Sequence, residues 1–209
     1  MVGQAASCGY GLSGWWRGEP LATTVIEVRG QPVVTLAELL LPGLRAVIVG
    51  LNPSQVSVDA EHYFQGRLGK RLWQRLQRAG ILHDLPVGRE DDEASRQGVG
   101  FCDVVRVPSA RASHLTRAIL RGAAPDLLER LMAAGVRPPT AVLFVYKTAH
   151  DAVGPLLREH GFRVFRMPGM YARSDEVERE LKRVGEELVR SAAAALDGAR
   201  GLSADMHRR

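Results

Sequence analysis

Cysteine is scarce in this sequence. Only Cys8 and Cys102 occur among its 209 residues, too few for a disulfide framework or for a four-cysteine zinc or iron–sulfur site. The six histidines are scattered without the spacing of metal ligands. We therefore expect a protein of a reducing compartment that holds no metal and needs no cofactor.

Two other kinds of signal are also missing. No apolar run is long enough to cross a bilayer, and no charged segment followed by an apolar one opens the chain, as it would in a secretory signal. Neither glycine-rich pattern that binds nucleotide phosphates, Gly-x-x-x-x-Gly-Lys or Gly-x-Gly-x-x-Gly, occurs in its expected context. We expect a soluble, non-exported protein with no membrane partner, and the second absence disfavours an enzyme of nucleotide metabolites.

The sequence does contain a modest excess of positive charge. Its 28 lysines and arginines exceed its 23 acidic residues, which gives a net charge of +5 and a pI near 9.7. A basic balance favours a polyanionic partner such as nucleic acid. An arginine- and alanine-rich chain from a GC-rich genome would show the same balance without such a partner, so charge alone leaves both explanations open.

Apolar and amphipathic stretches alternate from residue 45 onward. The apolar stretches predict strands, and the segments between them have the apolar spacing of helices. Such alternation is typical of an α/β sandwich with a largely parallel sheet. The predicted strands lie near residues 45–50, 100–106, 141–146 and 162–167, and the predicted helices near 69–79, 113–121, 124–134, 148–159 and 174–197.

Three further segments complete the prediction of structure. Residues 25–28 and 32–34 could pair as a hairpin, and a short helix is expected over 36–41. The polar segment 84–97 carries an acidic run at 90–93. We expect it to be a solvent-exposed loop that faces away from bound DNA, because its charge would repel phosphates.

The most informative segment is Gly50-Leu51-Asn52-Pro53, at the end of the apolar run 45–50. Glycine tolerates close approach and unusual dihedrals, and proline ends a strand and restricts the residue before it. Asn52 between them is a rigid amide that donates and accepts hydrogen bonds without a charge. Such a group suits the orientation of a water molecule or of a base edge. The tetrapeptide also suits an ordinary strand-to-helix turn, since asparagine is a good helix cap.

Together with further segments downstream, this motif resembles the uracil-DNA glycosylase superfamily, and within it the mismatch-specific uracil- and thymine-DNA glycosylases. The similarity covers about residues 35–190 and rests on the shared order of its segments. These segments are 35–44, 50–53, 62–64 (His-Tyr-Phe), 69–73 (Gly-Lys-Arg-Leu-Trp), 98–106 (Gly-Val-Gly-Phe-Cys-Asp-Val-Val-Arg) and 141–149. The sequence departs from the family at Lys70, where asparagine is more usual, and at 166–174, which lacks the usual Asn-Pro-Ser or His-Pro-Ser loop.

The resemblance implies a three-layer α/β/α sandwich with a mainly parallel four-stranded sheet, and a pocket for a base flipped out of DNA. Asn52 would position the hydrolytic water or contact the nucleotide, and Tyr63 or Phe64 would stack on the base. The two aromatic residues could equally be ordinary core residues. The other candidate base-binding residues are Gly50, Leu51, Pro53 and Phe101.

Asp103 is the one carboxylate that the sequence predicts to be buried, because it follows directly on an apolar stretch. Burial there would raise its pKa, and a nearby cation would lower it. It could activate water or stabilise the cationic sugar that develops as the glycosidic bond breaks. The alternative explanation is a helix cap, or an ion pair with Arg106 or Lys147.

Several other side chains are candidates for contact with DNA. Basic side chains near a helix start or a loop tip can neutralise phosphates, and apolar ones can enter the base stack as a wedge. The candidate phosphate contacts are Arg67, Lys70, Arg71, Lys147 and Arg173, and the candidate wedge is Met170 with Tyr171. A solvated basic face and a plain connecting turn would explain the same residues.

We therefore predict a monofunctional base-excision glycosylase that flips a uracil, or a related deaminated or mismatched base, out of DNA and hydrolyses its N-glycosidic bond. The alternatives are a superfamily member that binds DNA or removes a different lesion, and an unrelated α/β enzyme of nucleotide metabolites. We expect an N-terminal extension over 1–34, one domain over 35–197 and a flexible basic tail over 198–209. The partner would be damaged or mismatched duplex DNA, bound by a monomer in the bacterial cytoplasm at the nucleoid.

Overall fold

The computed structural model describes residues 22–169 and 175–188. Its central sheet has the strand order β4-β3-β5-β6, and all neighbouring strands are parallel. The four strands are β3 (Ala46–Gly50), β4 (Val99–Asp103), β5 (Ala141–Phe144) and β6 (Arg163–Arg166). The predicted parallel sheet is confirmed, although the ranges predicted for β4 and β5 run a few residues too far.

Burial on both faces explains why these strands are continuous apolar runs in the sequence. Every residue of β3, β4 and β5 is buried, as expected for parallel strands covered by helices on both sides. Strand β6 lies at one edge, and Arg163 and Arg166 at its two ends keep that edge polar.

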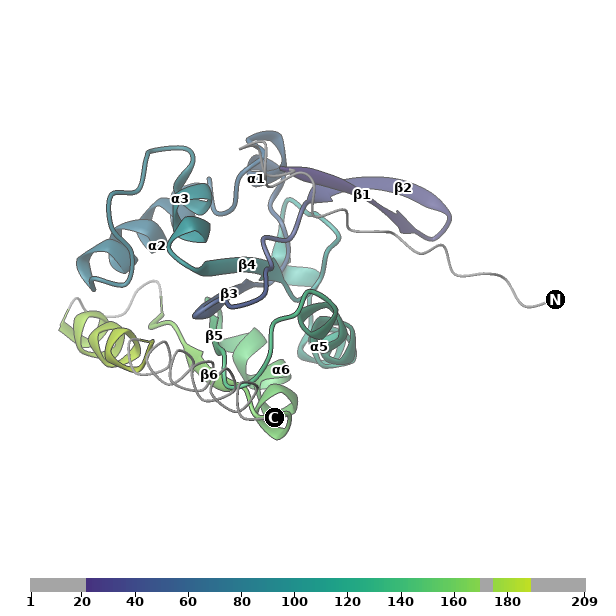
Figure 1. Cartoon of the computed structure of the whole chain (residues 1–209). Coiled ribbons are helices and arrows are strands. Elements are labelled where there is room, and N and C mark those ends of the chain that lie inside the picture. The colour runs from purple at the N-terminus through teal and green to yellow at the C-terminus, as the bar shows by residue number, and fades with distance from the viewer. Residues whose placement is uncertain (1–21, 170–174, 189–209) are drawn as a thin grey trace, which may run out of the picture.

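Helices cover both faces of the sheet (Figure 1). One face carries α2 (Arg67–Arg78), α3 (Glu90–Arg96) and the helix over 175–188, which share a core with the sheet. The other face carries α4 (Arg117–Gly122), α5 (Ala124–Ala133) and α6 (Lys147–Glu159). The predicted three-layer α/β/α fold is therefore confirmed. None of the described helices is long and apolar enough to span a membrane.

Helix α2 shows how local sequence selects a buried face. Leu72, Trp73 and Leu76 recur at helical spacing and are buried, whereas Lys70 and Arg71 are exposed. Trp73 therefore belongs to the core, as its spacing predicts, and α2 turns a basic face to solvent.

The predicted hairpin is present and is longer than expected. Its strands β1 (Thr23–Val28) and β2 (Gln31–Leu36) pair antiparallel and project beyond the central sheet (Figure 1). The two turn residues, Arg29 and Gly30, have positive φ of 52° and 74°, and turns of this hand match the twist of paired strands. Strand β2 crosses position 34/35, the predicted end of the N-terminal extension.

The prediction of a helix over 36–41 is wrong. Leu39 instead exchanges two backbone hydrogen bonds with Phe101, at N···O distances of 2.9 and 3.0 Å. This bridge covers the outer edge of β4, whose backbone groups would otherwise be unpaired. Gly100 permits the approach, because a Cβ there would lie 2.5 Å from the Leu39 carbonyl oxygen. The need to cover a sheet edge outweighs the local helical pattern.

The prediction that the acidic run at 90–93 lies in an exposed loop is also wrong. The run opens α3, and Glu90, Asp91 and Asp92 are only 7%, 2% and 6% exposed. Carboxylates are favourable at a helix N-terminus, and Glu90 and Asp91 also bond to the segment 62–65. Buried acids are rare unless they are partnered. Here the partners come from a distant part of the chain, which the polarity of the run alone does not reveal.

Candidate active site

A pocket of about 360 Å³ lies where the loops after β3 and β4 meet the start of α2. This is the carboxyl edge of the sheet, where open α/β folds bind their ligands. The loop after β3 leads into the short helix α1 (Gln55–Asp59), which Ser54 caps. The pocket wall brings together these predicted site residues: Leu51, Asn52, Pro53, Tyr63, Phe64, Arg67 and Asp103.

Asp103 ends strand β4 and faces this pocket although it is only 4% exposed. Burial, followed by the negative charge of Glu38, raises its pKa from 3.8 to about 8, and Arg130 opposes the rise. The alternative explanation of an ion pair does not hold, because Asp103 pairs with neither Arg106 nor Lys147, and Lys147 pairs with Asp151. No helix begins directly after β4 within the described chain, so Asp103 is not a helix cap either.

Gly50 makes room for the Asp103 carboxylate. The two residues are paired in register on adjacent strands, and a Cβ on Gly50 would overlap Asp103 Oδ1. The same Cβ would lie 3.5 Å from Cζ of Phe64. The Asp103 carboxylate and the Phe64 ring are thus both next to Gly50, whose lack of a side chain lets them approach the strand.

A partly buried ion pair supports the backbone behind Asp103. Arg130 donates through Nη2 to the carbonyl oxygens of Asp103 and Val104, each at 3.1 Å. The guanidinium also pairs with Glu38, and its Nε lies 2.8 Å from Asp126 Oδ2. Burial raises the pKa of Glu38 despite the attraction of Arg130. Sequence reasoning missed this pair, since its members lie 92 residues apart with no motif linking them.

The Asn52 side chain is held rigidly, as its place between Gly50 and Pro53 predicts. Its Nδ2 donates to the Val107 carbonyl oxygen at 3.0 Å and to Ser109 Oγ at 2.7 Å. The loops after β3 and β4 continue the parallel pairing of those strands, with Ser109 N donating to the Pro53 carbonyl oxygen at 3.1 Å. The two side-chain bonds to Val107 and Ser109 use the amide nitrogen of Asn52. The carbonyl oxygen Oδ1 takes part in none of the hydrogen bonds among described residues and so can accept one from a ligand or water.

Tyr63 and Phe64 belong both to the pocket wall and to the hydrophobic core. Both line the pocket, yet Tyr63 is only 3% exposed and both rings pack against the core. Phe101 lies beneath them and outside the pocket wall, with ring centroids 5.6 Å from Tyr63 and 6.3 Å from Phe64. It supports the aromatic wall from below.

The remaining predicted residues fall in three groups. Arg67 is exposed and lines the pocket at the start of α2, with Lys70 and Arg71 exposed on the following turn. Lys147 is exposed at the start of α6, where Asp151 pairs with it. Met170, Tyr171 and Arg173 lie outside the described residues.

Tyr146 also lines the pocket, although the sequence suggested no specific role for its side chain. Burial, and then the charge of Asp103, raise the pKa of its hydroxyl. Its position two residues beyond β5 was a usable signal, because the carboxyl ends of parallel strands gather at one edge.

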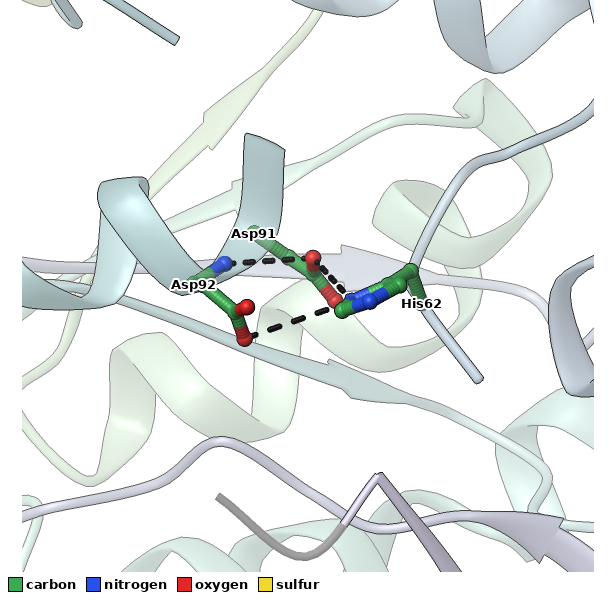
Figure 2. A group of neighbouring side chains, drawn as sticks. All are labelled: His62, Asp91 and Asp92. Carbon is green, nitrogen blue, oxygen red and sulfur yellow. Dashed lines mark hydrogen bonds and ion pairs between the residues drawn. The ribbon is translucent and has the colours of Figure 1, made fainter. Parts of the chain in front are cut away.

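Three side chains next to the pocket wall group atoms of the kind that ligate metal ions. His62, Asp91 and Asp92 place their ligand atoms within 4.8 Å of one another (Figure 2). His62 Nδ1 lies 2.9 Å from Asp91 Oδ1 and 4.0 Å from Asp92 Oδ1. Protein donors already occupy both carboxylates, since Asp91 Oδ2 accepts from Tyr63 N at 2.7 Å and Asp92 Oδ2 from Arg89 Nε at 2.8 Å. These contacts indicate that the three side chains stabilise the local structure rather than bind a cation.

Comparison with known families agrees with this geometry. The model of the uracil DNA glycosylase superfamily matches residues 39–187. The match contains the whole parallel sheet and every described pocket residue except Leu36, and it leaves out the β1–β2 hairpin.

Proposed function

This chain belongs to the uracil-DNA glycosylase superfamily, and on that premise we propose that it is a monofunctional DNA glycosylase of base excision repair. Its substrate would be a uracil, or a related deaminated or mismatched base, in duplex DNA. Members of the superfamily are DNA glycosylases, and the family match removes the alternative of an unrelated α/β enzyme. The particular base, action as a monomer and a place at the bacterial nucleoid are part of the proposal.

The observation that carries the proposal is the position of Asp103, buried in a pocket that also holds the Asn52 amide and the Phe64 ring. A glycosylase must extrude its nucleotide, hold the base and cleave the bond to the sugar. A pocket of about 360 Å³ can enclose one base, and Phe64 offers it an aromatic face.

The residues suggest how the bond breaks. The base departs with the electron pair of its N-glycosidic bond, which leaves positive charge on the sugar carbon C1′. An ionised Asp103 stabilises this charge, and its carboxylate accepts the proton of the water that adds to C1′. Asn52 Oδ1 accepts a hydrogen bond from that water or from the base edge, and its fixed amide keeps the geometry constant.

This role needs the ionised form of Asp103, whose pKa is about 8 in the free protein. At neutral pH the carboxyl group is mostly protonated, and a developing positive charge beside it favours ionisation. We therefore expect the single-turnover cleavage rate to rise as pH increases through about 8. A rate that falls over the same interval would instead assign Asp103 as a proton donor.

The exposed cations of α2 provide the surface that would contact DNA. Arg67 stands at the pocket wall, and Lys70 and Arg71 follow on the same helix. Lysine and arginine beside the mouth of such a pocket would bind the phosphates that flank the flipped nucleotide. Lys147 contributes less in this proposal, because Asp151 already neutralises it.

The test is a strand-cleavage assay on labelled duplexes that carry uracil, a thymine mismatch, hypoxanthine or xanthine, followed by alkali to break abasic sites. We expect alkali-dependent cleavage of at least one substrate. Asn52→Ala and Asp103→Ala should abolish it and leave DNA binding intact, whereas Glu129→Gln, an exposed change on α5, should have no effect. Full cleavage by both pocket variants would overturn the site assignment.

The same assay distinguishes the remaining alternative. Absence of cleavage on all four substrates, combined with tight and salt-sensitive binding of one of them, would identify a superfamily member that binds DNA or acts on a different lesion.

A further inference from the structure

The backbone of Phe64 adopts an unfavourable conformation. Its φ is 57°, in the left-handed region that bulky side chains rarely occupy. Such a residue persists only where the surrounding structure holds it, and conformations of this kind cluster at functional sites. Phe64 also forms part of the pocket wall, so whatever holds its backbone also places its ring.

Side chains from two other elements bind the backbone N–H groups of Tyr63 and Gln65, the residues before and after Phe64. Asp91 of α3 accepts a hydrogen bond from Tyr63 N at 2.7 Å. Ser57 of α1 accepts one through Oγ from Gln65 N at 3.2 Å. Both backbone donors that flank the strained residue are therefore bound by side chains remote in sequence, 28 and 8 residues away.

Asp91 is well suited to this task because its carboxylate is buried and fully engaged. It is 2% exposed, and Oδ1 accepts from Asp92 N at 3.1 Å while lying 2.9 Å from His62 Nδ1. Figure 2 shows Asp91 between its two neighbours. A carboxylate with several donors has one preferred orientation, and it transmits that orientation to the Tyr63 peptide.

Two further contacts complete the support. Glu90 Oε2 accepts from Gln65 Nε2 at 3.0 Å, which ties the far end of the segment to the same helix. Gly69 of α2 also packs against the Phe64 backbone, since a Cβ there would overlap the Phe64 carbonyl oxygen. Contacts from both α2 and α3 thus reach Phe64 or its direct neighbours.

We propose that Asp91 is a positioning residue of the active site, which acts through the Tyr63 peptide to hold Phe64 strained and its ring in place to stack on the flipped base. The acidic start of α3 thereby serves base binding from outside the pocket. This inference rests on the proposed glycosylase function. Whether Asp91 holds Phe64 in place can nevertheless be tested without measuring catalysis.

The chain offers a matched control for this proposal. Asp92 is on the same helix, is similarly buried at 6% and bonds to Arg89 rather than to the segment 63–65. Asp91→Asn and Asp92→Asn therefore make the same chemical change in the same helix, and only the first is made at the residue that binds Tyr63 N. Asp91→Ala is the stronger variant if it folds, as judged by far-UV circular dichroism.

The first readout does not depend on activity. Trp73 contacts the Phe64 ring edge-on, with centroids 5.9 Å apart, and replacing Trp15 and Trp16 by Phe leaves it the sole tryptophan. We expect Asp91→Asn to shift Trp73 emission and to speed hydrogen exchange of the Tyr63 amide, and Asp92→Asn to change neither. Unchanged exchange and emission in Asp91→Asn would overturn the proposal, as would equal changes in both variants.

The second readout is binding and cleavage of DNA that carries the excised base. Loss of base stacking should weaken lesion-specific affinity by about tenfold in Asp91→Asn and more in Asp91→Ala. Affinity for undamaged DNA and the single-turnover rate at saturating substrate should change much less. If no base is excised at all, the proposed function fails, while the Trp73 and Tyr63 readouts still decide whether Asp91 holds Phe64. If cleavage occurs and Asp91→Ala keeps wild-type lesion affinity, the positioning role fails alone.

Discussion

Asp103 and Asp91 are both buried carboxylates with a raised pKa, but their surroundings differ. Asp91 receives hydrogen bonds from Tyr63 N and Asp92 N and lies against His62. The Asp103 side chain receives no hydrogen bond from any described residue, and Arg130 reaches only its backbone oxygen.

The difference separates a structural carboxylate from one available for chemistry. Hydrogen-bond donors favour the ionised form of Asp91 and oppose the effect of its burial. In Asp103, burial and the negative charge of Glu38 disfavour the ionised form, so the carboxyl group remains protonated to an unusually high pH. Four substitutions test this difference and the role of the cations beside the pocket.

The largest effect is expected for Asp103→Asn on stability. A carboxyl group with a folded pKa of about 8 contributes most to stability below its unfolded value of 3.8, and this contribution is lost as pH rises from about 4 to 8. The amide does not titrate, so the variant should become more stable than the wild type across that window. The gain should reach several kcal/mol above pH 8, because each tenfold change in an ionisation constant corresponds to about 1.4 kcal/mol.

Urea denaturation of both proteins at pH 5, 7 and 8.5 measures this difference. It should grow steadily with pH, while cleavage activity is lost. A stability difference that is constant across the three pH values would show that Asp103 titrates normally.

Asp91→Asn should change stability in the opposite direction. The substitution leaves at least one buried donor among Tyr63 N, Asp92 N and His62 without an acceptor, which costs about 1–3 kcal/mol. Urea denaturation at pH 7 should show this loss. A gain in stability, as expected for Asp103→Asn, would mean that the two carboxylates are equivalent after all.

Glu38→Gln tests whether the charge of Glu38 raises the pKa of Asp103. Because the charge of Glu38 raises the pKa of Asp103, its removal should move the midpoint of the pH–rate profile below that of the wild type. Single-turnover rates between pH 5 and 10 measure this, with Glu129→Gln as the control for loss of one acidic charge. A midpoint that rises or stays fixed would remove Glu38 from the electrostatics of the site.

The smallest effect concerns the basic face of α2. Arg67→Ala should weaken DNA binding and reduce the slope of log K against log salt concentration by about one. Arg137, which precedes β5 at the amino edge of the sheet, provides the control variant Arg137→Ala, whose slope should match the wild type. Equal slopes in all three proteins would exclude Arg67 as a phosphate contact.

The architecture was predictable because its strands and helices follow from local patterns of apolar residues in the sequence. Apolar runs marked the buried strands β3, β4 and β5, and helical spacing marked the core face of α2, including Trp73. The same reasoning failed at 36–41 and 84–97. In both segments a partner distant in sequence decides the structure, an unpaired sheet edge in one and a strained aromatic segment in the other.

In the candidate site, too, some features follow from the local sequence and others depend on contacts between distant residues. Residue type and position after predicted strands selected Asn52 and Asp103, and the family resemblance added Phe64; all three line the pocket. The pKa of Asp103, by contrast, depends on its depth of burial and on its distance from Glu38 and Arg130. These quantities exist only after residues far apart in sequence have packed together, since both desolvation and Coulomb energy depend on three-dimensional separation.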